Sequence, residues 1–421
     1  MIRLPGFVSR DHVVTVPLDH RDPAGATIEV FARELVDPDK QHDDLPYLLF
    51  LQGGPGGRSP RPVDRSSWLG VALQTYRVIL LDQRGVGRST AITPAITRDR
   101  TPQQVADYLS LFRADSIVAD AEIIRRQLIG DRRWDTLGQS YGGFVTLTYL
   151  SQAPQGLAHC YVTGGVPGIR ASAADVYART FPRIVRRSQE YYARYPQDEA
   201  VMARLIDHVS EHEVLLPDGD VLTPHRLRVI GSPFGMSYGF EQVHWLLDDA
   251  WTDDGRPGDE LHPSFLYDMT TRTGFVDNVL YALQESTYAA GAATGWAAQQ
   301  EFDRRPEFAA DARPVLFTAE TMFPWMFAEI RALRPFAQAA DILAAKDGWP
   351  ALYDADRLNK NDVPLCAAVY HDDLYVDADL QLDTIAHTGN ARAWVTNEYE
   401  HDGLRTGDVL QRLLDMGNGR V

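Results

Sequence analysis

The feature that most constrains this chain is a glycine-bounded serine motif, Gly-Gln-Ser-Tyr-Gly, at residues 138–142. Residues 134–137 before it are typical of the end of a short strand, and residues 144–153 after it predict a helix that ends at Pro154. A serine on a tight turn from strand to helix needs small neighbours, because larger side chains would clash there, and the turn exposes its hydroxyl. The N-terminus of the following helix favours developing negative charge. The motif therefore predicts a reactive Ser140.

Strand-like and helical patterns alternate through the first part of the chain. The apolar runs at residues 47–51 and 76–81 are continuous, as expected of strands buried on both faces. Apolar residues recur at helical spacing between residues 102 and 129. Further strands are expected at residues 13–17, 27–35, 134–137 and 160–163. This alternation predicts an α/β fold in which a mostly parallel sheet is covered by helices on both sides.

The pattern changes after about residue 169. The following stretch is mostly helical in pattern and rich in aromatic residues, with a run at residues 314–318 as its main strand candidate. Late in the chain we expect two further strands and a last helix, at residues 364–370, 393–396 and 407–416. The sheet domain is thus predicted to be interrupted by a large helical cap. The expected segments are residues 1–168 for the first part of the sheet domain, 169–361 for the cap and 362–421 for the second part.

A nucleophilic serine needs a base, and the base needs an acid that orients it. In a sheet of this type the acid and then the base follow the serine along the chain, each in a loop after a strand. His401 is the last histidine before the terminal helix and is the predicted base. Three aspartates follow the first late strand. Asp373 is preferred as the acid because an apolar pair directly after it can anchor the loop, and Asp372 and Asp377 stay as alternatives.

The oxyanion formed on attack by a serine needs hydrogen-bond donors. One donor is expected from the backbone amide after the serine, that of Tyr141, and a second from the glycine-rich loop after residues 47–51. Glycine lets the backbone approach a reacting carbonyl closely. Gly54 is the predicted second donor.

Composition and motifs narrow the range of partners. With 41 Lys and Arg against 58 Asp and Glu the net charge is −17, so nucleic acid is not an expected partner. We expect neither a membrane span nor a signal peptide, because the sequence shows no long apolar run of either kind. Cys160 and Cys366 are expected to be buried free thiols in the reducing cytoplasm. Known metal and nucleotide motifs do not occur, so neither a metal nor a cofactor is expected. The sequence does not give the oligomeric state.

Three motifs occur in a characteristic order: Gly-Gly-Pro-Gly at residues 53–56, Asp-Gln-Arg-Gly-x-Gly-x-Ser at 82–89 and Gly-Gln-Ser-Tyr-Gly-Gly at 138–143. Together they resemble the prolyl aminopeptidases (proline iminopeptidases) of the α/β-hydrolase fold, through nearly the whole chain. Gln52, where the shorter members have His, suits the larger subtype of that family. The cap and the tail, including residues 397–405, look like that subtype as well.

The resemblance implies a serine peptidase that releases an N-terminal residue, usually proline, from small peptides with a free N-terminus. In that chemistry Ser140 attacks, His401 transfers the proton, Asp373 orients His401, and the amides of Gly54 and Tyr141 hold the oxyanion. Water then hydrolyses the acyl-enzyme.

The resemblance also implies cap carboxylates that bind the substrate's ammonium group, because a buried ammonium needs anionic partners. Glu285 and Glu320 are the expected residues, with Glu241 third. The aromatic residues Phe323, Trp325 and Phe327 either wall a pocket for a pyrrolidine ring or belong to the core of the cap.

Other functions are compatible with the same scaffold. An esterase, or an aminopeptidase that releases longer fragments, would keep the fold and the catalytic residues, because specificity lies in the cap. A catalytically silent binding protein is not expected, because the serine, the histidine and the glycine-rich loop are all intact.

Overall fold

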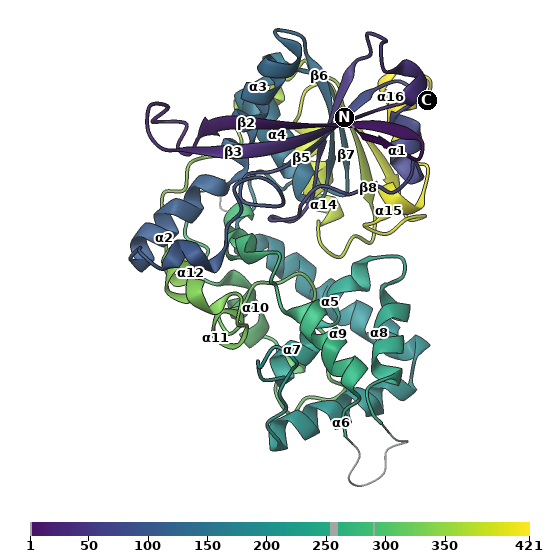
Figure 1. Ribbon diagram of the computed structural model, residues 1–421. Coiled ribbons are helices and arrows are strands. Elements are labelled where there is room, and N and C mark those ends of the chain that lie inside the picture. The colour runs from purple at the N-terminus through teal and green to yellow at the C-terminus, as the bar shows by residue number, and fades with distance from the viewer. Residues whose placement is uncertain (1, 253–259, 289–290) are drawn as a thin grey trace.

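The computed structural model describes residues 2–252, 260–288 and 291–421. Within these residues nine strands form one sheet in the order β1-β2-β3-β5-β4-β6-β7-β8-β9 (Figure 1). The strands are β1 (Ile2–Leu4), β2 (Phe7–Pro17), β3 (Thr27–Val36), β4 (Tyr47–Leu51), β5 (Arg77–Asp82), β6 (Trp134–Gln139), β7 (Leu157–Thr163), β8 (Leu365–Tyr370) and β9 (Ala391–Thr396).

The sheet is antiparallel at one side and parallel through the rest. Strands β1, β2, β3 and β5 pair antiparallel in that order. From β5 onward, through β4, β6, β7 and β8 to β9, each strand is parallel to its neighbour in the sheet. The predicted α/β fold with a mostly parallel sheet is therefore confirmed. Strand β2 begins earlier than predicted because Arg10 and Asp11 are exposed and polar but still pair with β3, which an apolar pattern does not reveal.

Helices cover both faces of the sheet (Figure 1). Leu49 and Leu51 of β4 pack on the face covered by α3 (Ala114–Ile129), α4 (Tyr141–Gln152) and α14 (Ala378–Ala386). Leu48 and Phe50, which point the other way, belong to the core formed with α1 (Ser67–Ala72), α15 (Gly403–Thr406) and α16 (Val409–Gly417). Alternate residues of one strand thus reach opposite faces, and both faces are apolar.

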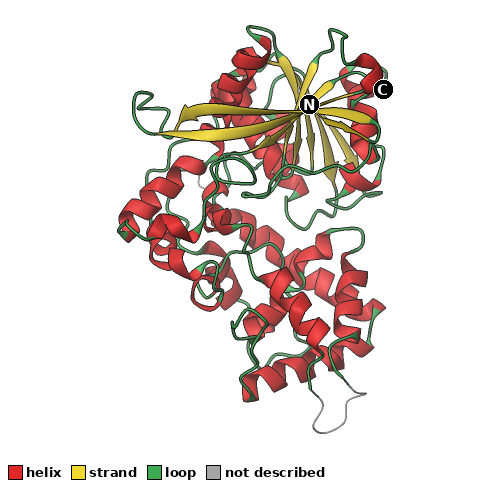
Figure 2. Ribbon diagram, in the orientation of Figure 1, coloured by secondary structure: helices red, strands yellow, loops and turns green. Residues whose placement is uncertain are grey.

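Between β7 and β8 the described residues add helices and no strand to the sheet, and Figure 2 shows this region as a separate helical layer beside the sheet. The helices are α5 (Ala173–Arg194), α6 (Gln197–Glu211), α7 (Pro224–Val229), α8 (Gly239–Asp248), α9 (Pro263–Thr273), α10 (Ala297–Asp303), α11 (Met326–Glu329), α12 (Ala337–Ala344) and α13 (Ala355–Asn359). Helix α2 (Pro102–Leu109), from the first part of the chain, packs against α12. The extra helical region is as expected, and the boundaries at residues 168/169 and 361/362 stay a prediction.

The strand predicted at residues 314–318 is not formed. Residues 315–318 are buried, but side chains and the carbonyl of Arg228 in α7, not a neighbouring strand, bond to their backbone. The Tyr192 hydroxyl donates to the carbonyl of Val315 (2.7 Å), and the Ser188 hydroxyl accepts from the amide of Phe317 (3.3 Å). The apolar run therefore marks burial in the cap and not a position in a sheet.

Two further expectations concern the state of the two cysteines and the presence of membrane-spanning helices. Cys160 and Cys366 lie on the adjacent strands β7 and β8, and both are free and buried, as predicted. Among the described residues, no helix has both the length and the apolar character required to cross a membrane.

Candidate active site

Ser140 lies between the end of β6 and the start of α4 with φ 56° and ψ −125°, a strained backbone conformation for a residue with a side chain. The turn is tight because the helix begins at the next residue. A Cβ atom on Gly142 would lie 1.9 Å from the carbonyl oxygen of Leu51, so only glycine fits there. The motif at residues 138–142 thus holds Ser140 where strand, turn and helix meet, as the sequence predicts.

The structure brings Asp373 and His401 together from the loops after β8 and β9. Nδ1 of His401 lies 2.8 Å from Oδ2 of Asp373, and both side chains are buried. The other carboxylate oxygen of Asp373 accepts the backbone amides of Tyr375 (2.9 Å) and Val376 (3.0 Å). These bonds hold the carboxylate in place. Because Nδ1 of His401 contacts Asp373, Nε2 is the ring nitrogen left to accept a proton from another group.

The two alternative aspartates have other partners. Asp372 is half-exposed and pairs with Arg186 at 2.9 Å. Asp377 caps the start of α14 through the amide of Leu380 and pairs with Arg183 at 2.9 Å. Of the three predicted candidates, Asp373 is therefore the one in contact with His401.

The electrostatic surroundings favour the imidazolium form of His401. Burial alone would lower the pKa of His401, but the Asp373 carboxylate beside it and the more distant Glu320 together raise this pKa above its usual value. A histidine with a raised pKa holds a proton more strongly, which suits a residue that accepts a proton and later donates it.

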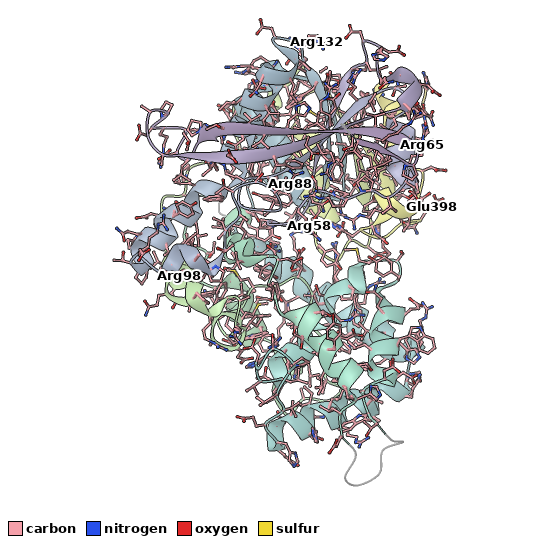
Figure 3. All side chains as sticks on the ribbon, viewed as in Figure 1. Arg58, Arg65, Arg88, Arg98, Arg132 and Glu398 are labelled. Carbon is pink, nitrogen blue, oxygen red and sulfur yellow. The ribbon has the colours of Figure 1, made fainter. Side chains whose placement is uncertain are left out.

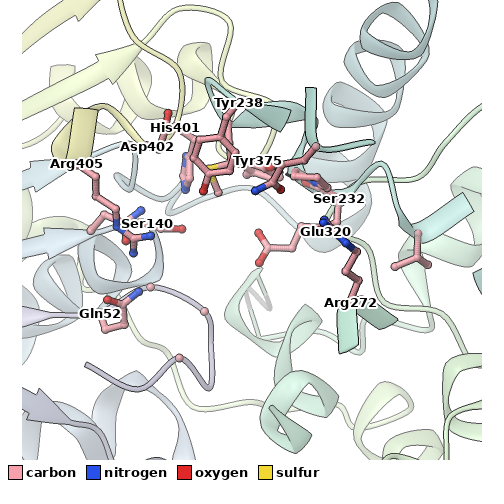
Figure 4. A pocket seen from close by; sticks show the side chains of 18 of the residues that line it. Gln52, Ser140, Ser232, Tyr238, Arg272, Glu320, Tyr375, His401, Asp402 and Arg405 are labelled. Carbon is pink, nitrogen blue, oxygen red and sulfur yellow. Dashed lines mark hydrogen bonds between the residues drawn. The ribbon is translucent and has the colours of Figure 1, made fainter. Parts of the chain in front are cut away.

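Ser140 and His401 line one cavity of about 420 Å³ between the sheet and the cap (Figure 4). From the sheet part, Gly54 and Gln139 also line it. The cap contributes the apolar side chains of Val229, Ile230, Pro233 and Met236, and the charged side chains of Arg272 and Glu320. The cavity thus combines a serine hydroxyl, an imidazole, an apolar wall and the Glu320 carboxylate.

Two backbone amides are available for an oxyanion. Gly54 has φ +136°, a conformation that side chains rarely allow, and its N–H has no acceptor among the residues that the structure describes. Tyr141 is the first residue of α4, where helical N–H groups have no intrahelical acceptor. The structure therefore leaves both predicted donors available, with Gly54 in the cavity wall.

The motif at residues 82–89 positions the loop that carries Gly54. The side-chain amide of Gln83 donates to the carbonyl of Gln52 (3.0 Å), and the Asp82 carboxylate accepts from the backbone amide of Ser59 (3.1 Å). These contacts hold the loop on both sides of its glycines. The second motif of the resemblance thus supports the site without lining the cavity.

The three predicted glutamates lie in different places. Glu320 lines the cavity, has no hydrogen bond or ion pair with any described residue, and has a pKa raised to about 7 by burial. Glu285 is buried away from the cavity lining, and its carboxylate accepts the amides of Ala297 (3.1 Å) and Ala298 (2.9 Å) at the start of α10. Burial raises the pKa of Glu285 to about 7 as well. Glu241 is half-buried outside the cavity and pairs with the guanidinium of Arg194.

A cap segment at residues 232–238 directly contacts the loop that carries His401. The amide of His401 donates to the carbonyl of Gly235 (3.0 Å), and the Ser237 hydroxyl donates to the Asp402 carboxylate (2.6 Å). The cap is therefore attached to the histidine loop itself. Sequence reasoning missed this segment, because its Pro-Phe-Gly turn signals a loop without indicating what the loop contacts.

Tyr375 also links the cap to the catalytic loops, since its hydroxyl donates to the carbonyl of Ser232 (2.6 Å) and accepts the amide of Gly235 (3.1 Å). The sequence indicated Tyr375 as a loop anchor but not these partners. Phe323 and Trp325 stack on each other in the cap with ring centroids 5.7 Å apart, and neither lines the cavity. Phe323 and Phe327 are buried in the cap core, Trp325 packs partly buried against that core, and Phe327 does not line the cavity either.

The nine-stranded sheet and the strained serine turn define a class, the serine hydrolases of the α/β-hydrolase fold. A model of the alpha/beta hydrolase fold family matches residues 46–207. The chain is 45% identical over 416 residues to a proline iminopeptidase from Aeromonas sobria, covering 98% of this chain and 97% of the relative. It is 32% identical to a proline iminopeptidase from Aspergillus aculeatus, covering 96% and 93%. The chain therefore belongs to the proline iminopeptidase family.

The chain also aligns with solved structures at low similarity. A crystal structure of a proline iminopeptidase from Mycobacterium smegmatis aligns with a TM-score of 0.45 and 16% identity, covering 97% of this chain and all of that chain (100%).

Proposed function

We propose that this chain is a serine aminopeptidase that releases N-terminal proline from small peptides through an acyl-enzyme. The observation that carries the proposal is the Glu320 carboxylate, which has no partner among the described residues and shares a cavity with Ser140 and His401. An isolated carboxylate beside a nucleophile suits a substrate with a positively charged group near its reacting carbonyl. Membership of the proline iminopeptidase family supports proline as the residue released.

In the proposed reaction His401 takes the proton of Ser140 as the hydroxyl attacks the carbonyl carbon of the N-terminal residue. The amides of Gly54 and Tyr141 stabilise the negative oxygen of the tetrahedral intermediate. His401 then protonates the departing amine, and the peptide bond breaks to leave an ester on Ser140. Water, deprotonated by the same histidine, hydrolyses that ester and restores the serine.

The proposed specificity has two parts. Glu320 binds the ammonium group, and because of its pKa of about 7 this carboxylate is ionised mainly above that pH. The apolar side chains of Val229, Ile230 and Met236 lie in the same cavity and provide a surface for a pyrrolidine ring. Glu285 and Glu241 were also predicted to bind the amine, but the contacts described above engage both carboxylates elsewhere, so the proposal relies on Glu320.

The chemistry can be tested with a diphenyl phosphonate analogue of proline, used with a free and with an acetylated amine. We expect the free-amine reagent to inactivate the enzyme by attachment to Ser140, located by peptide mapping, and the acetylated reagent to react far more slowly. Ser140→Ala is the control and should take no label. Absence of an adduct at Ser140 would refute the serine mechanism, and equal rates for both reagents would favour an esterase or an endopeptidase.

We also propose a cytoplasmic location and no nucleic-acid partner. The buried free thiols Cys160 and Cys366 suit a reducing compartment, and the net charge of −17 disfavours contact with a phosphate backbone.

A further inference from the structure

A second cavity, of about 580 Å³, adjoins the catalytic cavity, and the two share Gln52 and Arg405 in their linings. Its other walls come from the loop after β4, including Arg58 and Arg61, and from α1, including Trp68. The Ser67 hydroxyl donates to the backbone carbonyl of Arg405 (2.9 Å), which ties the two walls together. We name this second cavity the arginine groove.

The arginine groove is positively charged in a chain whose net charge is −17. Arg61 pairs with Asp82, but the exposed guanidinium groups of Arg58 and Arg405 have no hydrogen bond or ion pair with any residue that the structure describes. Figure 3 shows Arg58 where the sheet part meets the cap. The carboxylate in the lining is that of Asp64, which accepts from the amide of Ser66. Two arginines are thus available for an anion.

The position of the groove relative to Ser140 indicates which part of a substrate it meets. In Figure 4 Arg405 lies on one side of Ser140 and Glu320 on the other. The two parts of a peptide extend to opposite sides of the carbonyl carbon that the serine attacks. If the amine lies at Glu320, the residues after the cleaved bond extend toward Arg405 and the arginine groove.

We propose that the arginine groove binds the leaving part of the peptide, and that Arg405, with Arg58, binds a carboxylate there. The inference rests on the proposed aminopeptidase function. Arginine forms paired hydrogen bonds with carboxylates, which makes it suited to this recognition. The enzyme would then prefer short peptides whose free C-terminal carboxylate reaches the groove. An acidic side chain after the cleaved bond offers the same chemistry.

The test compares kcat/KM for three substrates: prolyl-alanine, prolyl-alanine amide and prolyl-glutamate amide. The first has a C-terminal carboxylate, the second has none and the third has only a side-chain carboxylate. We expect kcat/KM for the free dipeptide to be about ten times that for its amide, because a hydrogen bond to a charged group contributes at least this factor. A high rate for prolyl-glutamate amide as well would extend the preference to acidic side chains.

Variants assign the effect to the groove. In Arg405→Gln we expect the ratio of free dipeptide to amide to fall to about two or less, because a guanidinium pair becomes a neutral amide. General effects on turnover, including a change in the pKa of His401, cancel in this ratio. Arg58→Gln should lower the ratio by a smaller factor. Arg272→Gln is the matched control, since Arg272 lines the catalytic cavity on the cap side but not the groove, and it should leave the ratio unchanged.

Two results would overturn the inference: equal kcat/KM of the wild type for dipeptide and amide, or an unchanged ratio in Arg405→Gln. Hydrolysis of proline anilide, which has no carboxylate, separates this failure from a failure of the proposed function. If the anilide is cleaved while the ratio is one, the aminopeptidase function stands and the groove proposal fails. If no prolyl substrate is cleaved, both fail.

Discussion

The change that tests amine recognition most specifically is Glu320→Gln. The substitution keeps the size and shape of the side chain but removes the negative charge from the cavity. Losing one partner of a desolvated charge pair costs about 2–5 kcal/mol, and about 1.4 kcal/mol corresponds to a factor of ten. Taking about 3 kcal/mol, because Glu320 is only partly buried in the free enzyme, the kcat/KM for proline anilide should fall about 150-fold.

The pH dependence of the same variant provides a second readout. Glu320 raises the pKa of His401, because a nearby negative charge favours the imidazolium. Removing that charge should lower the pKa of His401, so the acidic limb of the activity profile moves to lower pH. In the wild type, kcat/KM should rise with pH through about 7, as Glu320 itself loses its proton. The assay is hydrolysis of proline anilide from pH 5 to 9, with an amine-free ester measured in parallel.

The loss of activity in Glu320→Gln should depend on the substrate's amine. The ester has no ammonium group, so its kcat/KM should fall much less than that of proline anilide. An equal loss for both substrates, or a loss below about threefold for the anilide, would refute the assignment of Glu320 to the ammonium group.

Three other changes have expected outcomes. Asp373→Asn should lower kcat for proline anilide by about 10³ to 10⁴, because an amide favours the wrong imidazole tautomer. Asp372→Asn, at the half-exposed neighbour that pairs with Arg186, should change kcat less than twofold. Similar losses in both variants would contradict the assignment. Glu285→Gln should lower the free energy of unfolding in urea by about 1–2 kcal/mol, because the single side-chain oxygen of glutamine replaces two carboxylate oxygens that each accept a backbone N–H of α10. The same variant should raise KM less than Glu320→Gln does. Gly142→Ala should cost about 3 kcal/mol or more in the same unfolding measurement, because the new methyl group would overlap the carbonyl of Leu51; a normal unfolding curve would contradict the close packing.

Much of the sheet and of the loops that carry Ser140 and Asp373 could be predicted from the sequence, because both depend on short local patterns. Continuous apolar runs mark strands buried on two faces, as at residues 47–51, and the turn around Ser140 needs glycines at fixed positions. The preference for Asp373 rested on the apolar pair after it. In the structure the amides of Tyr375 and Val376 bind that carboxylate.

The cap could not be predicted to the same depth, because its contacts join segments far apart in the chain. Glu285 and Glu320 have similar local sequences, and what separates them is the approach of Ala297 and Ala298 to Glu285 alone. The sequence also does not distinguish apolar residues that line the cavity, such as Ile230, from those that fill the cap core, such as Phe323. The sequence does not indicate a role for Arg405 in binding, because its place in the lining of the arginine groove depends on the fold.

The most direct test of the central claim, an amine-gated prolyl aminopeptidase, is the hydrolysis of three anilides by the wild-type enzyme: those of proline, alanine and N-acetylproline. We expect cleavage of the proline anilide, weaker cleavage of the alanine anilide and none of the acetylated substrate, because acetylation removes the positive charge that Glu320 binds. Equal cleavage of proline anilide and its acetylated form would contradict the account, and the cavity would then belong to an esterase or to an enzyme that cleaves within peptides.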